Sequence, residues 1–211
     1  MPAIPKHRTP IIDAAVELFR RQGYAKTGLN DIVDASGAPK GSLYYYFPTG
    51  KASIAVAAIE EAGERVVATV RDLARKTGST ADLVKAHAKL LAGWMRASRF
   101  RDGCPITTVL LEMAPEDRAV AEAGRAAYRG RLAVMQEKLI EDGFAEEQAK
   151  RLALLCVSTL QGSLIQARID QSGAPIEIAA EELGVLLDAR REGLSQQSGA
   201  PEKAPARRKR A

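Results

Sequence analysis

The sequence predicts an all-α fold of about nine helices, arranged as an N-terminal three-helix unit and a larger C-terminal helical bundle. Apolar residues recur at helical spacing in nearly every segment, and the apolar–polar alternation of half-buried strands is absent. Glycine, proline and short Ser/Thr clusters separate these segments, so each segment stops where a helix is expected to end.

The first predicted helix covers residues 8–23. Its apolar face consists of Ile12, Ala15, Val16 and Phe19. The apolar residues available in the next two segments are Ile32, Val33, Leu43 and Phe47. A helix with one apolar face buries that face against a partner. We therefore expect these residues to form one small core that fixes the direction of the third helix.

Two short helices follow, over residues 28–36 and 39–46, with one glycine between them. Gly37 ends the first helix because glycine adopts a positive φ without steric penalty. Pro39 begins the second, where its missing N–H removes no helical hydrogen bond. Two helices around a tight glycine turn predict a helix-turn-helix, whose second helix enters the major groove of DNA.

Six longer helices are predicted to form the bundle. Their ranges are 50–76, 80–100, 104–114, 117–142, 146–172 and 176–192. The breaks between them contain glycine, proline or serine, as at Gly103 and Pro115. Acidic residues near two of the starts, Asp82 and Asp117, suit the positive end of a helix dipole.

A dense set of residues runs through the N-terminal unit. It comprises Gly23-Tyr24, Thr27, Asp31-Ile32-Val33, Ala35-Ser36-Gly37 and all of residues 40–48. This order resembles the DNA-binding domain of TetR-family transcriptional repressors, from the helix at 11–21 to about residue 60. Gly103-Cys104-Pro105 before an apolar helix resembles the LmrA/YxaF branch of that family. The sequence departs from the family at Tyr46, where histidine is usual, and at residues 49–52, where Ser-Lys-Glu is frequent.

The resemblance implies DNA contacts in and beside helix 39–46. Lys40 can reach guanine acceptors or a phosphate, Gly41 allows close backbone approach, and Ser42 can donate a hydrogen bond. The resemblance adds the neighbouring tyrosines, a threonine that could bind phosphate or cap the second helix, and a lysine as phosphate anchor. The full expected set is Thr27, Gly28, Lys40, Gly41, Ser42, Tyr44, Tyr45, Tyr46 and Lys51.

The resemblance also implies a homodimer formed by helices 146–172 and 176–192. Two recognition helices about 34–36 Å apart would then read a palindromic double-stranded DNA operator. The alternative, that both apolar stripes are intrachain core, stays open. The stripe residues are Leu152, Leu155, Thr159, Gly162, Ser163 and Gln166, with Ile176, Ala179, Leu183, Leu186 and Leu187.

A small apolar or amphipathic effector is implied in the bundle, where its binding would release DNA from a repressor. The candidate pocket residues are Trp94, Met95, Met113, Tyr128, Met135 and Gln161, with Phe100 and Val109. The same residues would also suit a plain core. An activator of the same fold, and a helical protein-interaction module without specific DNA binding, stay open as functions.

Composition argues against an enzyme. The two histidines, His7 and His87, form no metal-ligand pattern, and the HExxH, GxSxG and Walker motifs are absent. We therefore expect no cofactor and no metal. Cys104 and Cys156 lie outside any CxxC pattern, so neither a disulfide nor a zinc framework is expected; Cys104 is either a redox-sensitive or a structural thiol.

The net charge of +5 lies at the two ends of the chain. Residues 1–51 carry +3, residues 52–199 carry −2 and residues 200–211 carry +4. We expect a DNA-binding domain at 1–50, a bundle at 51–194 and a disordered basic tail at 195–211, whose cluster at 203–210 either binds DNA nonspecifically or keeps the chain soluble. No signal peptide and no stretch approaching a membrane span are expected, which favours the cytoplasm.

Overall fold

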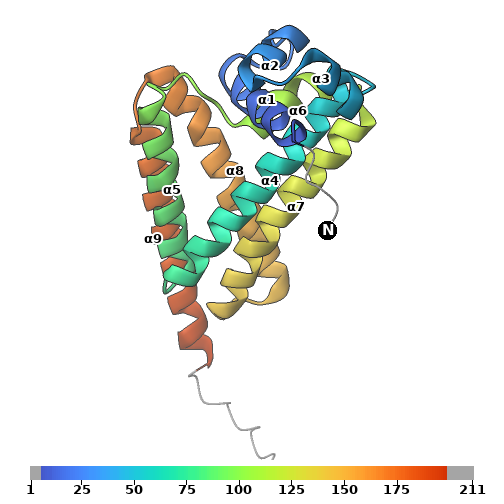
Figure 1. Cartoon of the computed structure of the whole chain (residues 1–211). Helices are drawn as coiled ribbons and strands as arrows, with labels where there is room; N and C mark the ends of the chain where they lie inside the picture. The colour runs from blue at the N-terminus through green and yellow to red at the C-terminus, as the bar shows by residue number, and fades with distance from the viewer. Residues whose placement is uncertain (1–5, 199–211) are drawn as a thin grey trace, which may run out of the picture.

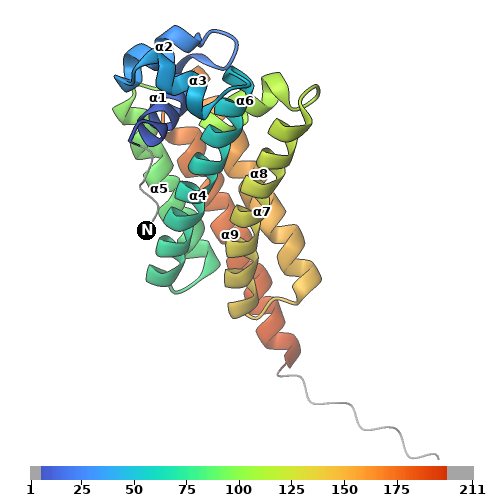
Figure 2. The ribbon, with the colours of Figure 1, turned by 45° about the vertical axis from the view of Figure 1, so that its right-hand side comes forward.

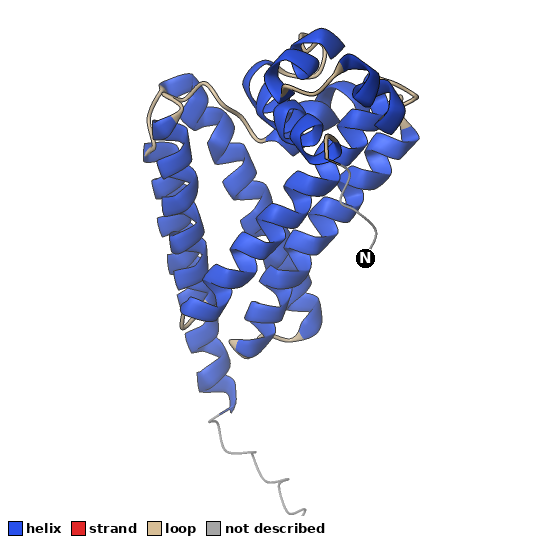
Figure 3. Cartoon of the chain, viewed as in Figure 1, coloured by secondary structure: helices blue, strands red, loops and turns tan. Residues whose placement is uncertain are grey.

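The computed structural model describes residues 6–198, and this part of the chain contains nine helices and no strand (Figure 3). The helices are α1 Arg8–Gln22, α2 Leu29–Ser36, α3 Lys40–Tyr46, α4 Lys51–Lys76, α5 Thr80–Ala97, α6 Pro105–Met113, α7 Arg118–Glu141, α8 Glu146–Asp170 and α9 Ala174–Ser198. The all-α prediction is confirmed, and most observed boundaries lie within two residues of the expected ones.

The three short helices α1–α3 sit at one end of the long helices (Figure 1). Below them α4 packs mainly on α7, α5 packs mainly on α9, and α8 packs on both α7 and α9. The view turned by 45° shows the same arrangement, with α1–α3 above the bundle (Figure 2). The helix-turn-helix unit therefore rests on the bundle through α4, α6 and α1.

The buried apolar residues of the described chain form two cores, and α4 contributes to both. Its first half, including Ile54 and Ile59, packs with α1–α3, α6 and the start of α7. Its second half, including Val70, packs with α5, α8, α9 and the end of α7. Glycine allows α4 and α7 to approach closely, because a Cβ at Gly63 would lie 2.8 Å from the Cβ of Ala127. One continuous helix therefore connects the two cores.

Two helix boundaries differ from the prediction. α5 ends at Ala97 rather than at residue 100, because Arg99 and Phe100 adopt left-handed backbone with φ of 52° and 58°. α9 begins earlier, at Ala174, since Pro175 is tolerated in the first turn of a helix. It also continues to Ser198, so residues 195–198 are helical and not part of a disordered tail. The rest of the predicted tail, with the basic cluster at 203–210, lies outside the described residues.

α8 corrects the expectation about membrane spans. Among the described residues it is the one helix that is long and apolar enough to cross a membrane. Core helices often have the same length and composition, and α8 packs on α7 and α9 while keeping an exposed apolar stripe.

Candidate nucleic-acid interface and adjoining cavity

The core of the helix-turn-helix fixes the direction of α3. Leu43 is fully buried and Phe47 is 3% exposed, and both pack in the cluster that contains Phe19 and Ile32. Gly37 has φ 63°, the left-handed turn that the sequence predicts between α2 and α3. The expectation that Leu43 and Phe47 are structural is confirmed, and the opposite face of α3 is left uncovered.

That uncovered face carries aromatic and polar side chains. Tyr45 is 79% exposed and Tyr44 is 48% exposed, whereas tyrosine is on average intermediate in burial. Lys40 and Gly41 are also exposed, and a Cβ added at Gly41 would meet no atom within 4 Å. Glycine weakens a helix by about 1 kcal/mol relative to alanine, and packing within the described residues gives no reason for one at this position.

Ser42 and Tyr46 lie at the edges of this face. Ser42 is half-buried. The Tyr46 ring is half-buried against the first core and meets the Tyr45 ring edge-on, with centroids 5.0 Å apart. Tyr46 therefore supports the orientation of Tyr45 through ring packing.

The structure corrects the expected role of Thr27. Its side chain is fully buried, and its hydroxyl donates a 2.7 Å hydrogen bond to the carbonyl of Gly23. The hydroxyl is therefore unavailable to a phosphate and does not cap α2. The exposed N–H of Gly28, which precedes α2, instead donates to the Asp31 carboxylate at 2.8 Å.

Lys51 connects α4 to the loop before α2. Its Nζ donates to the carbonyls of Tyr24 at 3.0 Å and Thr27 at 2.9 Å, and lies 4.1 Å from the centroid of the Tyr24 ring. Two of the three ammonium donors are thus used within the protein. Phosphate anchoring by Lys51 stays a prediction for the third donor.

α6 holds the end of α1 and the loop after it by polar contacts that the sequence alone did not suggest. The Glu112 carboxylate accepts hydrogen bonds from the N–H groups of Tyr24 at 2.9 Å and Ala25 at 2.7 Å. Just before α6, the N–H of Gly103 donates to the carbonyl of Arg20 at 2.8 Å. These partners are about 80 or more residues apart in sequence, which is why helical periodicity could not reveal them.

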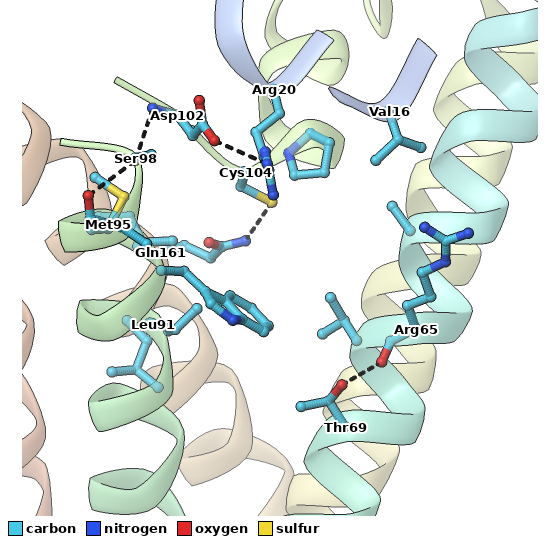
Figure 4. A pocket seen from close by; sticks show the side chains of 18 of the residues that line it. Val16, Arg20, Arg65, Thr69, Leu91, Met95, Ser98, Asp102, Cys104 and Gln161 are labelled. Atoms are coloured by element: carbon cyan, nitrogen blue, oxygen red, sulfur yellow. Dashed lines mark hydrogen bonds and ion pairs between the residues drawn. The ribbon is translucent and has the colours of Figure 1, made fainter. Parts of the chain in front are cut away.

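A cavity of about 750 Å³ lies directly beside this joint (Figure 4). Its wall contains residues of α1, α4, α5, α7, α8 and the segment between α5 and α6. Figure 4 shows Val16 of α1, Arg65 of α4, Leu91 of α5 and Gln161 of α8 around the same space. A ligand in this cavity would therefore touch the bundle and the helix-turn-helix unit together.

The predicted pocket residues divide into two groups. Trp94, Met95, Met135 and Gln161 line the cavity. The other four are not on its wall. Tyr128 stands one layer behind, where its hydroxyl accepts from Gln161 Nε2 at 3.1 Å. Met113 and Val109 pack in the first core, and Phe100 packs against the second.

Three polar groups that sequence reasoning did not combine meet in this cavity. Arg131 is 6% exposed and lies over the Tyr128 ring, 5.1 Å from its centroid. Burial, and secondly the charge of Arg131, lower the pKa of His87 to about 4, so His87 is neutral. Burial raises the pKa of the Cys104 thiol, but Arg131 and hydrogen bonds from Thr107 and Gln161 outweigh it, and the pKa lies below its ordinary value.

Cys156 has the opposite environment. Burial raises the pKa of its thiol to about 12, so it stays protonated and packs as a small apolar side chain. No group of three or more His, Cys, Asp or Glu side chains suited to a metal ion occurs within residues 6–198.

The outer surfaces of α8 and α9 are unusually apolar. The exposed apolar residues are Leu154, Leu155, Ile165 and Ile169 on α8, with Ile178 and Val185 on α9. Gly162 and Ser158 lie exposed in the same α8 stripe, and a Cβ at Gly162 would meet no atom within 4 Å. Of the stripe residues expected from sequence, Leu152, Ser163, Ile176, Leu183 and Leu187 are buried and belong to the intrachain core.

Comparison with known proteins agrees with this geometry. Residues 11–58 match the family described as bacterial regulatory proteins, tetR family, and residues 80–182 match the transcriptional regulator LmrA/YxaF-like, C-terminal domain. The HTH-type transcriptional regulator YxaF of Bacillus subtilis is 32% identical over 85% of this chain and 94% of its own length. The HTH-type transcriptional regulator LmrA of the same organism is 32% identical over 80% of this chain and 90% of its own length.

The fold has solved counterparts as well. The crystal structure of regulatory protein TetR from Rhodobacter sphaeroides superimposes with a TM-score of 0.75 and 22% identity, covering 84% of this chain and 97% of that one. At this identity the similarity concerns the fold alone.

Proposed function

Because this chain belongs to the TetR family of transcriptional regulators, with an LmrA/YxaF-like C-terminal domain, we propose that it is a ligand-responsive homodimeric repressor. It binds a palindromic operator through α3 and leaves DNA when an effector enters the cavity. As a bacterial regulator of this kind it acts in the cytoplasm, and no catalytic step is part of the proposal.

The observation that carries the DNA-binding role is the uncovered face of α3. Tyr44 and Tyr45 are exposed while Leu43, between Ser42 and Tyr44, is fully buried. An aromatic pair next to a lysine supplies ring surface, hydroxyl groups and one positive charge to a polyanion. The open position at Gly41 lets the backbone of α3 approach the groove, since no side chain separates them.

Dimer formation is supported by the apolar surface of α8 and α9. Six large apolar side chains there are exposed in a single protomer, and Gly162 leaves room for the close approach of another helix. One recognition helix reads only a few base pairs, so two copies held on one face of the duplex would supply the remaining affinity and specificity.

The route from effector to DNA runs through the joint between α6 and α1. The cavity wall includes Arg20 of α1 and Asp102 of the segment before α6, which form an ion pair at 3.0 Å. An effector that favours one arrangement of this joint would shift α1 and, through the first core, α3. Its differential affinity for the two arrangements sets the size of the response.

Selection from a random double-stranded DNA library, followed by fluorescence anisotropy, tests the DNA-binding role. We expect selected sites to be palindromic and Tyr45→Ala to bind them at least tenfold more weakly. Tyr128→Phe, which changes a tyrosine inside the bundle, should bind as the wild type does. Failure to enrich any sequence at moderate salt would favour a protein-interaction module, and transcription that rises with the bound regulator would identify an activator.

A further inference from the structure

Arg131 carries a buried positive charge without a counter-charge. Its side chain is 6% exposed, and no carboxylate within residues 6–198 lies within ion-pair distance of it. Its Nε has no hydrogen-bond partner in the part of the chain that the structure describes. The guanidinium lies over the face of the Tyr128 ring, 5.1 Å from its centroid, and this contact offsets part of the charge. Buried guanidinium groups are ordinarily paired, because desolvation is otherwise uncompensated.

His87 is a second unsatisfied group on the same wall. It is 6% exposed, lines the cavity with Arg131, and its Nδ1 lacks a partner among the described residues. Because the ring is neutral, one of its nitrogens carries a proton that can be donated. The terminal NH2 groups of Arg131 and the Nε2 of His87 are absent from the enclosed, unpartnered atoms, and both residues line one cavity. A guanidinium and an imidazole N–H that face the same space form a donor set for an anion.

The remaining charges on the wall do not supply that anion. Glu17 and Asp102 are the only carboxylates among the lining residues, and both are occupied by Arg20. The other arginines on the wall are Arg20, Arg21 and Arg65, which pair with carboxylates, and Arg99 and Arg101, which are exposed. The apolar part of the wall includes Leu91, Trp94, Met95, Met135, Leu160 and Leu164.

We propose that the cavity binds an amphipathic anion, a small organic acid whose carboxylate pairs with Arg131 and whose apolar body lies against Trp94 and Met95. The Nε2–H of His87, the ring nitrogen that is not enclosed by the protein, supplies a second hydrogen bond to the carboxylate. This anion site rests on the proposed function in one respect: the cavity is taken to be the effector site. A volume of about 750 Å³ holds an acid of ten or more carbon atoms without filling all of the space.

The single tryptophan of the chain lies on this wall and reports binding directly. Its fluorescence should be titrated with decanoate and with 1-decanol, which share an apolar body and differ in charge. We expect decanoate to bind the wild type at least tenfold more tightly than decanol. Arg131→Met should abolish this preference, and Arg131→Lys should keep part of it. Arg129→Met, at an exposed position on the same helix, should leave both affinities unchanged.

Thermal unfolding shows whether the variants are folded and gives an independent readout. Arg131→Met should unfold at a higher temperature than the wild type without ligand, because it removes an unpaired buried charge. Decanoate should raise the midpoint of the wild type and not that of Arg131→Met. Equal affinity of the wild type for both probes, absence of decanoate binding, or an unchanged preference in Arg131→Met would each overturn the proposal.

Operator binding measured with each probe separates the anion site from the effector role in the proposed function. If decanoate binds through Arg131 but leaves operator affinity unchanged, the anion site stands and the effector role in the proposed function fails. If decanol alone binds and releases DNA, the effector role stands and the anion site fails.

Discussion

Lys40 is the residue on which a base-reading contact is easiest to test. It occupies the first turn of α3 with an exposed side chain and takes part in no ion pair within residues 6–198. Lys40→Ala should weaken operator binding by about 1–3 kcal/mol, the usual range for one base contact. Fluorescence anisotropy with the selected operator measures the change. Lys89→Ala, at an exposed position on α5, is the matched control. If Lys40→Ala and Lys89→Ala bind the operator equally tightly, Lys40 does not contact DNA.

His87 makes stability depend on pH in a defined window. Its folded pKa of about 4 is below the ordinary value of 6.5, so the unfolded chain takes up a proton first as pH falls. The stability linked to neutral His87 is therefore complete above about pH 6.5 and is lost as pH approaches 4. Between pH 7.5 and 5.0 the loss should be about 2 kcal/mol.

Urea unfolding of the wild type and His87→Gln at both pH values isolates this contribution. Other titrating groups are common to the two proteins and cancel in the comparison. The wild type should lose about 2 kcal/mol more than the variant. Parallel loss in both proteins would mean that the imidazole is hydrated in the folded state.

Burial of apolar side chains could be predicted from the sequence, but the partners of individual polar side chains could not. The burial of Leu43 and Phe47 follows from spacing alone, because one helical face must enter the core. The inward position of Thr27 does not, since a threonine hydroxyl bonds equally well to a phosphate or to the nearby carbonyl of Gly23. Arg131 illustrates the same limit, because only the folded chain shows that no carboxylate lies near it.

At the level of elements, Glu112 joins α6 to the loop after α1. Its carboxylate accepts from two backbone N–H groups, those of Tyr24 and Ala25, which have no helical partner. Glu112→Ala should lower the free energy of unfolding by about 1–2 kcal/mol, because both donors lose a charged acceptor. It should also reduce the change in operator affinity that an effector produces, since the joint then couples less tightly.

Glu116→Ala is the control for this experiment, because Glu116 is exposed in the turn after α6 and its carboxylate forms no ion pair with any residue between 6 and 198. Urea unfolding and anisotropy with effector measure the two expected effects. Similar stability of both variants would show that the loop keeps its structure without Glu112.

Helix order was predictable from sequence for a physical reason. Periodicity and helix-ending residues act locally, so all nine ranges overlap the observed helices. The cavity and the joint between α6 and α1 depend on contacts between residues far apart in sequence, as in the pairing of Glu112 with Tyr24. Local signals also failed at Arg99 and Phe100, which adopt left-handed backbone although neither is glycine.

At the scale of the whole molecule, the cavity, the two cores and the apolar stripe of α8 share helices. The cavity wall includes α1, α4 carries residues of both cores, and the apolar stripe lies on α8, which also lines the cavity. In the proposed repressor, a ligand between these helices would shift α3 relative to α8. In a dimer joined through α8 and α9, that shift would change the separation of the two recognition helices, and they would no longer match the fixed spacing of the DNA half-sites.

The proposed response to an effector therefore depends on a dimer formed through α8 and α9. Ile165 is 54% exposed near the middle of the α8 stripe, and Val185 is 60% exposed on α9. Ile165→Glu or Val185→Glu would add one carboxylate to each protomer, so that the dimer interface would bury two like charges. Both positions are exposed in the protomer, so the intrachain core would not be disturbed. We expect each variant to elute as a monomer in size-exclusion chromatography with light scattering and to bind the operator at least a hundredfold more weakly. Leu111→Glu, at a 74% exposed position on α6 outside the stripe, should remain dimeric. A dimeric Ile165→Glu protein with full operator affinity would place the interface elsewhere on the chain and would leave the exposed apolar residues of α8 without an assigned partner.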